Sequence, residues 1–304
     1  MEKAELRFKV LGTDVYLVIA CEKDEKDLAQ NSLEEAKEIY LAQNKIFSRF
    51  DPKSELSHSN GNLGKFIKVS EDFLTVVKKV LQYYRESQGI FDSRIIEALE
   101  RIGYKKNFKD NDFKDVEIVQ GDKFVNLEED LKIEEKKVFF GKRMDFSGIV
   151  KGFITDKVAE FLKKNDWKNF LVDSGGDISV SGKNAEDKEW IISLEEIPED
   201  KLLLGVSNEG LATSGITRRK WSSDGRKFHH LINPKNITEF KFDLKSVTVI
   251  AEDTAKSDVW AKVLFLLGKE AGLKLSEENN IKSLFLDYKG ALFLSSRVRD
   301  NIIK

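Results

Sequence analysis

Hydrophobic and polar residues follow two different periods along this chain. Alternating or continuous apolar runs predict strands, in segments 7–20, 170–182, 190–197, 202–215, 240–252 and 282–296. Apolar residues at helical spacing predict helices, in segments 27–48, 70–87, 151–164 and 256–274. We expect Asp253, Thr254 or Ser257 to begin the last helix. We expect Gly268 to interrupt it near its end.

The order of these elements indicates the fold class. Strands at both ends of the chain, with helices between them, favour an α+β fold with mixed sheets and packed helices over strict βαβ repetition. The 304 residues suffice for one large domain or two intimate ones with a real core. We therefore expect a single domain over residues 1–304, built as one body or as two intimate subdomains. The charged segment 105–124 is either a surface excursion or a boundary.

Composition excludes several classes of function. The 51 basic and 53 acidic residues leave a formal net charge of −2, which gives no general attraction for nucleic acid or an anionic membrane. No stretch reaches the roughly 18 continuous apolar residues of a membrane span. The lone Cys21 excludes an internal disulfide framework and a cysteine-based zinc site, and it fits a reducing compartment.

The segment VYLVIAC (15–21) resembles the end of a lipoprotein signal, with Cys21 as the lipidated residue. Gly12, Thr13 and Asp14 interrupt the apolar run that such a signal needs. The flanking residues alternate like the two halves of a strand or hairpin. We therefore expect mature protein at these positions, and a cytoplasmic location rather than an exported lipoprotein.

The segment GIVKG (148–152) is the first candidate binding site. Glycines let a backbone approach a ligand closely, and a helix N-terminus offers free N–H groups to an anion. Lys151 adds a positive charge at the same place. This combination suits a phosphate group, although the spacing is not that of a Walker motif. The alternative is a glycine turn with a solvated lysine.

Two strand segments contain further polar candidates. Gly175 and Gly176 lie between Asp173 and Asp177, whose carboxylates would share one face of a strand. The alternative for this segment is a β-bulge or a tight turn.

The segment ATSG (212–215) offers the hydroxyl groups of Thr213 and Ser214, followed by Arg218 and Arg219. Such donors could hold a phosphate or the edge of a flavin, or they could belong to an ordinary turn beside a solvated basic pair.

Two further pairs of residues complete the candidates. His229 and His230 would lie on opposite faces of a strand. Either could act as a general base near neutral pH or be a satisfied structural residue. Asp258 and Lys262 share one face of the last predicted helix and can form an ion pair.

In this order and spacing, the segments resemble the FAD:protein FMN transferase family, also called the ApbE family. The resemblance covers most of the chain. Its motifs are LGTDVYLVI (11–19), FSRFDPKSELSHSN (47–60), Gly89 to Asp92, Asp145 to Phe153, Val172 to Asp177, Ala212 to Gly215, His230 to Ile237, and Ser246 to Gly268. Each motif alone is weak, but eight of them in order identify the chain as resembling this family.

The resemblance implies an α+β, T-fold-like architecture and a group-transfer reaction. Members of the family bind FAD and, with a divalent metal that is usually Mg²⁺, move its FMN half to a threonine or serine of a target protein. AMP leaves in the same reaction. The implied partners are FAD and a flavin-acceptor protein, with the FAD site between the subdomains where two are present.

The resemblance also implies roles for individual residues. The FAD-binding residues would be Asp92, Lys151, Gly152, Gly175, Gly176, Asp177, Thr213 and Ser214. His230 would take the proton from the acceptor hydroxyl. Asp258 would bind the metal and act in catalysis.

This sequence departs from the family pattern near the metal and histidine motifs. Lys262 stands where the family has a metal-binding threonine, and an ammonium group has no lone pair for a metal. Mg²⁺ is therefore expected to bind weakly. Ser147 replaces a glycine, Asn233 replaces an aspartate, and segment 236–237 replaces a Thr-Gly pair.

These departures leave other functions open. The protein could bind FAD without transferase activity, or it could hydrolyse FAD slowly to FMN and AMP. A module that has lost the site and serves interactions alone is a third alternative.

Overall fold

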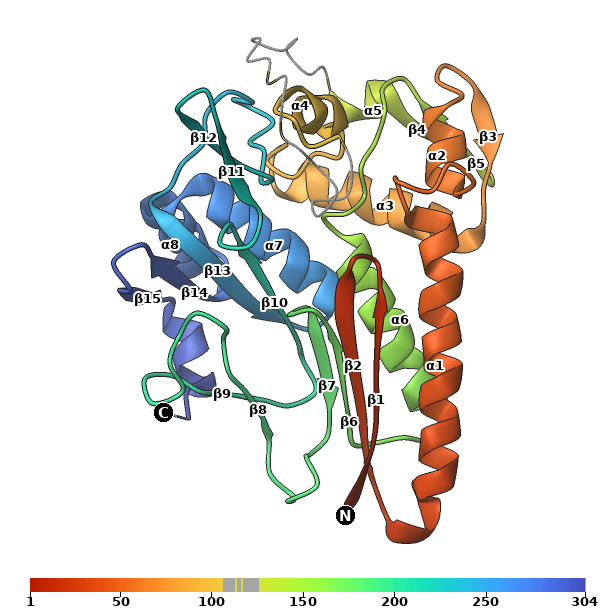
Figure 1. The fold of residues 1–304 in the computed structure, drawn as a ribbon, viewed down its shortest axis with the longest axis vertical. Helices are drawn as coiled ribbons and strands as arrows, with labels where there is room; N and C mark the ends of the chain where they lie inside the picture. Colours follow the sequence, from red (N-terminus) through yellow and green to blue (C-terminus); the bar gives the residue numbers. More distant parts are fainter. Residues whose placement is uncertain (106–112, 114–115, 117–125, 304) are drawn as a thin grey trace.

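A computed structural model gives the fold of the chain and describes residues 1–105, 113, 116 and 126–303 (Figure 1). Its main element is an eight-stranded sheet in the order β1-β2-β6-β7-β10-β13-β14-β15. The strands are β1 (Glu2–Val10), β2 (Thr13–Cys21), β6 (Phe170–Ser174), β7 (Ile178–Ser181), β10 (Gly210–Gly215), β13 (Leu244–Ala251), β14 (Lys282–Asp287) and β15 (Leu292–Leu294). Neighbouring strands in this sheet pair antiparallel.

The central strands of the sheet are mostly buried on both faces, which explains their long apolar runs. Leu17 and Ile19 in β2 belong to the apolar cluster on the helix side, whereas Val18 belongs to the cluster on the opposite side. Four helices lie on the first side, namely α1 (Lys26–Phe47), α6 (Val150–Lys164), α7 (Thr254–Leu267) and α8 (Lys269–Glu278). The predicted α+β class is confirmed.

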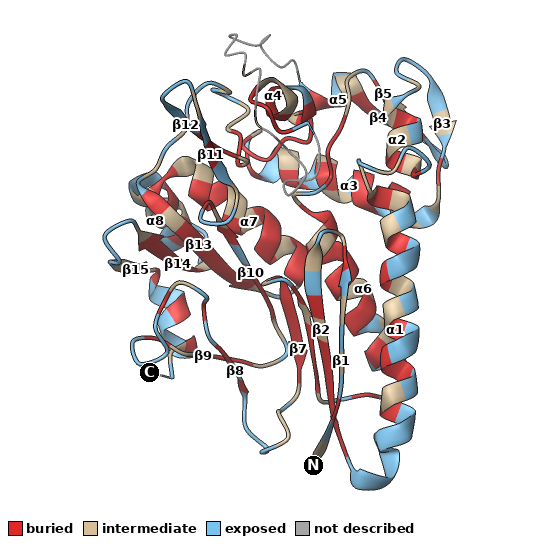
Figure 2. Ribbon diagram, in the orientation of Figure 1, coloured by how far each residue is buried: buried red, intermediate tan, exposed pale blue. Residues whose placement is uncertain are grey.

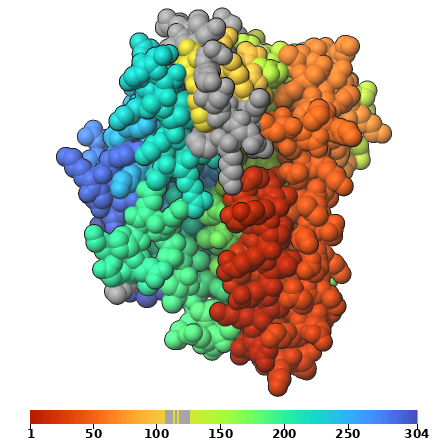
Figure 3. Space-filling view, viewed as in Figure 1, coloured from red at the N-terminus to blue at the C-terminus, as the bar shows by residue number. Residues whose placement is uncertain are grey.

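The opposite side of the sheet is covered by a small strand pair and the chain end. The pair is β8 (Trp190–Ile192) with β9 (Leu204–Val206), and the 3₁₀ helix η3 (Ser296–Asn301) follows β15. Trp190 and Val298 share one apolar cluster with Val18. In the space-filling view, the N-terminal hairpin lies between α1 and the segment that contains β8 (Figure 3).

A second group of elements packs at one end of α1 and α6. It contains α2 (Glu55–Asn60), α3 (Glu71–Glu86), α4 (Ile96–Arg101), α5 (Leu127–Asp130), and a three-stranded sheet of β3 (Phe66–Lys68), β5 (Lys137–Phe140) and β4 (Leu131–Glu134). Phe73 of α3 stacks on Phe47 of α1, with ring centroids 5.8 Å apart. Both rings belong to the same apolar cluster as Phe170 of β6, so this group and the helix side of the main sheet share one core (Figure 2).

A β-hairpin closes over α4. It consists of β11 (Lys220–Ser223) and β12 (Arg226–His229). The indole Nε1 of Trp221 donates to the carbonyl of Ile102 at 2.9 Å, and Phe228 packs in the same cluster as Leu99. His230 is the residue directly after β12.

The longer helices lie where the apolar periodicity predicts them. Individual residues determine where α7 begins and ends. Asp253 caps α7 by accepting a hydrogen bond from the Lys256 N–H at 2.6 Å. Gly268 ends α7 in a backbone conformation with φ of 85°, and α8 begins directly after it. The helices α2, α4 and α5, of four to six residues, are too short for a periodic signal.

The structure describes segment 7–20 completely but only a small part of segment 105–124. Of the two alternatives for segment 7–20, a strand or a hairpin, the structure shows the hairpin, because β1 pairs with β2 along its whole length. Most of the charged segment 105–124 lies outside the described residues. Within the described part of the chain, no helix combines the length and apolar character needed to cross a membrane.

Candidate active site

The N-terminus of α6 and the β6–β7 turn bring two opposite charges together. Lys151 lies in the first turn of α6, and Asp177 directly precedes β7. The Nζ atom of Lys151 is 2.6 Å from Oδ2 of Asp177, whose side chain is 1% exposed. Lys151 is thus the second residue of a helix, as the sequence predicts, and it is paired with a buried carboxylate rather than solvated.

The glycines around Lys151 allow α7 to approach α6. A Cβ atom on Gly152 would lie 2.6 Å from Cα of Ala255, which is backbone and cannot move aside. A Cβ atom on Gly148 would lie 2.9 Å from Nζ of Lys262. The sequence suggests that these glycines approach a ligand, whereas in the structure their missing side chains make room for the first turns and a lysine of α7.

The segment VDSGGD forms a tight turn between two strands rather than one continuous strand. Gly175 has φ of 65°, and a Cβ atom there would collide with the side chain of Thr13, so glycine is required. The N–H of Gly176 donates to Oδ1 of Asp173 at 2.7 Å. The two carboxylates therefore have separate roles: Asp173 stabilises the turn, and Asp177 pairs with Lys151.

Buried hydroxyl groups fix the start of this turn against the helices. The Oγ atom of Ser174 is 2.6 Å from the hydroxyl oxygen of Tyr40 in α1 and 2.6 Å from Oγ1 of Thr155 in α6. Ser174 and Thr155 are fully buried. This network joins α1, α6 and β6 one residue away from the glycine pair.

Helix α7 adds a second lysine–aspartate pair. Nζ of Lys262 is 3.3 Å from Oδ1 of Asp258 and donates to the carbonyl oxygen of Gly148 at 2.8 Å. The Lys262 side chain is 16% exposed and that of Asp258 is 7% exposed. The predicted ion pair on one face of this helix is confirmed, and the contact with Gly148 was not visible in the sequence.

The two pairs form one electrostatic cluster. Burial, followed by repulsion from Asp258, raises the pKa of Asp177 to about 7. Burial lowers the pKa of Lys151, but attraction to Asp177 and Asp258 outweighs it, so that this pKa is raised overall. The cluster thus combines two aspartate and two lysine side chains. The Oδ1 atom of Asp177 and the Oδ2 atom of Asp258 are buried and have no hydrogen-bond partner among the described residues.

The two neighbouring histidines have different environments. His229 is buried, with Nε2 3.1 Å from the carbonyl oxygen of Lys241 and its ring edge-on to Phe240, Phe242 and Phe265. Burial lowers the pKa of His229 to about 4. His229 is therefore a structural residue at the end of β12, packed among these aromatic rings.

His230 lies nearer to the charged cluster. Its Nδ1 atom is 3.4 Å from the carbonyl oxygen of Arg219. Burial, with additional repulsion from Arg219 and Lys262, holds the pKa of His230 well below its ordinary value. The imidazole is therefore neutral, and a proton on Nδ1 leaves the Nε2 lone pair free to accept another proton.

The hydroxyl residues of β10 lie on opposite faces of the sheet. Thr213 is exposed, and its Oγ1 atom is 2.9 Å from that of Thr248 in β13. Ser214 is buried on the other face. Neither hydroxyl has a described contact with the lysine–aspartate pairs, so the part that these two residues take in FAD binding stays a prediction.

Asp92 is held in a buried ion-pair network. Both of its carboxylate oxygens accept from Arg94, at 2.7 and 3.1 Å, and Arg94 also donates to Asp130 at 2.7 Å. The adjacent Ser93 carbonyl accepts from the N–H of Asp145 at 2.7 Å, which ties this segment to the start of the segment that leads into α6. Asp92 thus supports the loop before Lys151, and its predicted contact with FAD stays a prediction.

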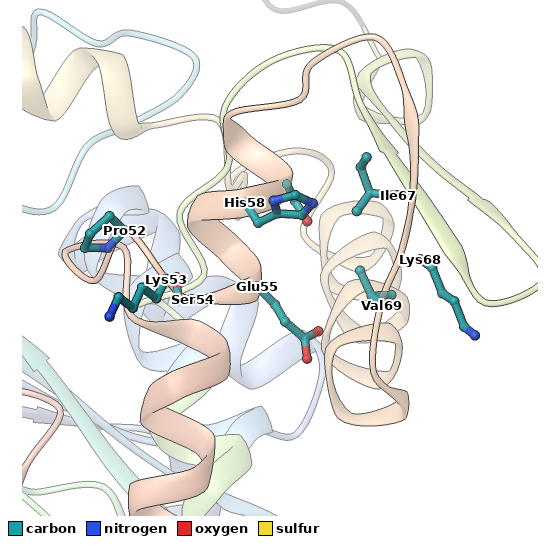
Figure 4. A pocket seen from close by; sticks show the side chains of 9 residues that line it. Pro52, Lys53, Ser54, Glu55, His58, Ile67, Lys68 and Val69 are labelled. Atoms are coloured by element: carbon teal, nitrogen blue, oxygen red, sulfur yellow. The ribbon is translucent and has the colours of Figure 1, made fainter.

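The SELSHSN motif (54–60) lines a pocket to which no residue of the charged cluster contributes (Figure 4). The pocket has a volume of about 260 Å³ and lies between α2 and β3. Glu55 accepts from both the N–H and the hydroxyl group of Ser70 at 3.0 Å, next to the start of α3. This motif therefore orders the junction of α2 and α3.

Lys262 occupies part of the position where a divalent cation would bind. The described residues contain no group of three or more His, Cys, Asp or Glu side chains placed to hold a metal. The Gly148 carbonyl oxygen and Oδ1 of Asp258, which could bind a cation, already accept hydrogen bonds from Lys262, whereas Oδ2 of Asp258 has no partner among the described residues. A Mg²⁺ ion at Asp258, as the resemblance implies, would therefore compete with Lys262 for the Gly148 carbonyl oxygen and Oδ1 of Asp258.

Comparison with known proteins decides the family. A model described as the ApbE family matches residues 11–285. The chain belongs to the ApbE family. The match includes Lys151, Asp177, His230, Asp258 and Lys262, so every residue of the charged cluster lies within the family region.

Two curated members show how far the similarity extends. The FAD:protein FMN transferase of Haemophilus influenzae is 27% identical over 287 residues, which cover 90% of this chain and 83% of the relative. That of Vibrio cholerae is 27% identical over 251 residues, covering 80% and 75% of the two chains.

Solved structures of the family have the same fold. The ApbE protein of Thermotoga maritima superposes with a TM-score of 0.86 at 22% identity, and each chain is covered completely. The flavinyl transferase ApbE of Pseudomonas stutzeri gives a TM-score of 0.85 at 21% identity, with 99% of this chain and 96% of that chain covered.

Proposed function

We propose that this protein is an FAD:protein FMN transferase, which moves FMN from FAD to a threonine or serine hydroxyl of an acceptor protein and releases AMP. Membership of the ApbE family supports this function. The observation that carries it is the ammonium group of Lys151, held 2.6 Å from Asp177 at the N-terminus of α6. A helix N-terminus with an adjacent cation suits a pyrophosphate.

The reaction exchanges one phosphorus–oxygen bond for another. The acceptor hydroxyl oxygen attacks the phosphorus of the FMN half, and the bond from that phosphorus to the bridging oxygen breaks. AMP leaves with the bridging oxygen and its negative charge. Catalysis then requires positioning, stabilisation of charge on the phosphate oxygens, and removal of the hydroxyl proton.

The described residues can supply each of these requirements. Lys151 and Lys262 provide positive charge, and Asp177 and Asp258 hold the two ammonium groups in place. His230 is neutral and can take the hydroxyl proton at Nε2. Lys262 already donates to the Gly148 carbonyl oxygen and Oδ1 of Asp258, so the positive charge in this mechanism comes from the two ammonium groups.

Asn233 gives a specific reason to consider FAD binding without transfer. It replaces a family aspartate three residues after His230, on the segment that follows β12. If this change weakens contact with the acceptor, the protein would retain FAD or pass its FMN half slowly to water. Both outcomes use the same lysine–aspartate pairs.

One experiment separates these functions. The purified protein is incubated with FAD and a flavin-acceptor domain, and the acceptor mass and free AMP are measured together. Transfer predicts an acceptor mass increase equal to FMN less one water, with equimolar AMP. A control acceptor with valine in place of its threonine should stay unlabelled. AMP without labelling would indicate a pyrophosphatase, and bound FAD without AMP would indicate binding alone.

We also propose a cytoplasmic location, which the position of Cys21 supports. Cys21 is buried at the end of β2 and pairs with Glu2 of β1. Processing to a lipidated Cys21 would remove β1 and nearly all of β2 from the main sheet. Localisation of the tagged protein by cell fractionation tests this proposal.

A further inference from the structure

The ammonium group of Lys262 lies in a site built from two distant parts of the chain. It donates to the carbonyl oxygen of Gly148, 114 residues away in sequence, and lies near Oδ1 of Asp258, one helical turn earlier in α7. Gly148 has no side chain where a Cβ atom would lie 2.9 Å from Nζ and 3.3 Å from Cε. The glycine therefore gives the lysine the room to reach this carbonyl.

These oxygens are the kind that bind a hard cation. Carbonyl and carboxylate oxygens are preferred ligands of Mg²⁺, which requires distances of about 2.0–2.1 Å and several further oxygens. An ammonium group donates hydrogen bonds to the same two oxygens at longer distances and contributes one positive charge. Because Nζ is 2.8 Å from the Gly148 oxygen, a divalent ion on the same oxygens would lie beside a like charge.

The geometry leaves one donor of Lys262 for a substrate. An ammonium group has three N–H donors, and the carbonyl of Gly148 and the carboxylate of Asp258 use two of them. The third can donate to a phosphate oxygen. Lys151 is in the same electrostatic cluster, since Asp258 acts on the charge of Lys151 as well.

We propose that the Lys262 ammonium group is a built-in cation that takes the place of the divalent metal, so that this protein handles the FAD pyrophosphate without Mg²⁺. The proposal rests on the proposed function for its substrate. In the transfer step, Lys262 stabilises negative charge on the phosphate oxygens as the bond to AMP breaks. Nothing is oxidised or reduced, and the hydroxyl proton leaves through the base described above.

Metal binding tests the proposal without any activity measurement. Binding of Mn²⁺ is measured by the loss of its free EPR signal, with chelator-treated protein in the presence and absence of FAD. The native protein should show no binding up to millimolar Mn²⁺, and Lys262→Thr should gain a site because it removes the cation and adds an oxygen. Equal or tighter Mn²⁺ binding by the native protein would overturn the proposal.

A second measurement follows FAD affinity in EDTA and in Mg²⁺. The native protein should bind FAD equally in both conditions. Lys262→Met, which keeps the length of the side chain and removes its charge, should bind FAD about tenfold or more weakly, equivalent to one charge-assisted contact. Lys256→Met is the matched control, because Lys256 lies on the same helix and pairs with Glu252 at the surface.

Acceptor labelling separates failure of this inference from failure of the proposed function. Labelling by the native protein in EDTA at the rate seen in Mg²⁺ supports the inference, and labelling that requires Mg²⁺ overturns it. If no condition gives labelling, the proposed transferase function fails. The Mn²⁺ and FAD measurements then still decide whether Lys262 replaces the metal.

Discussion

The carboxylate of Asp156 in α6 accepts a hydrogen bond from the backbone N–H of Thr254, the first residue of α7, at 2.7 Å. Its second oxygen accepts from the N–H of Ala255 at 2.8 Å. One carboxylate thus satisfies two N–H groups that a helix N-terminus leaves without intrahelical partners. It fixes the start of α7 relative to α6, and so the distance between Lys151 and the Asp258–Lys262 pair.

Asp156 should make stability depend on pH. Burial, followed by repulsion from Asp253, raises the pKa of Asp156 to about 6 in the folded protein, against 3.8 for an ordinary aspartate. A raised pKa means that the folded state binds the proton more tightly, so this contribution is complete below pH 3.8 and is lost as the pH rises through 6.

The Asp156→Asn variant tests this dependence. Asparagine does not titrate, so the stability advantage of the native protein over the variant should fall by on the order of 2–3 kcal/mol between pH 4 and pH 7. Urea unfolding at both pH values measures the difference. A constant difference across this range would contradict the raised pKa.

Gly152→Ala should separate α6 from α7. The added Cβ atom would lie 2.6 Å from Cα of Ala255 and 2.7 Å from the carbonyl oxygen of Thr254, both backbone atoms. Such overpacking should destabilise the protein by about 2 kcal/mol or more. Gly61→Ala is the control, since its Cβ would meet atoms no nearer than 3.4 Å. Thermal unfolding of both variants measures the loss of stability. Equal destabilisation by the two substitutions would contradict the close contact between α6 and α7.

The buried His229 should make the free energy of unfolding fall as the pH drops. Its pKa is lowered from 6.5 to about 4 by burial, so the unfolded chain takes up a proton over this range before the folded protein does. This contribution to stability is complete above pH 6.5 and is lost as the pH falls to 4, a change on the order of 3 kcal/mol.

The His229→Gln variant removes the titration and keeps a hydrogen-bond donor for the carbonyl of Lys241. Its unfolding free energy should fall less steeply between pH 6.5 and pH 4 than that of the native protein. His58→Gln, at an exposed position, is the control substitution. A native slope in the His229 variant would show that other groups cause the acid sensitivity.

Lys151→Ala should weaken FAD binding. Removing the ammonium group takes away a cation at the N-terminus of α6 and leaves the buried Asp177 carboxylate without its partner. FAD affinity should fall by at least about 1 kcal/mol, as measured by calorimetry. The double variant Lys151→Ala with Asp177→Asn removes the unpaired charge. If the double variant regains full affinity, repulsion by Asp177 rather than loss of Lys151 explains the effect.

The sequence by itself determined the family and most of the long elements. The order of the motifs from Asp145–Phe153 to Ser246–Gly268 identified the resemblance that the family comparison then showed. Helical spacing located α1, α3, α6 and the break at Gly268, because these features repeat or stop over many neighbouring residues. Elements of three to six residues, such as α2 and β3, gave no such signal.

Only the tertiary structure decided what the glycines and charges of the site contact. The sequence placed Lys151 at a helix start, but it gave no reason to pair Lys151 with Asp177, to fit Gly152 against Ala255, or to bring Lys262 to the carbonyl of Gly148. These contacts join residues that are far apart in the chain, and they depend on how closely α6 and α7 pack. Local periodicity fixes which face of a helix is apolar, whereas the separation of two helices follows from side chains and missing side chains on both of them.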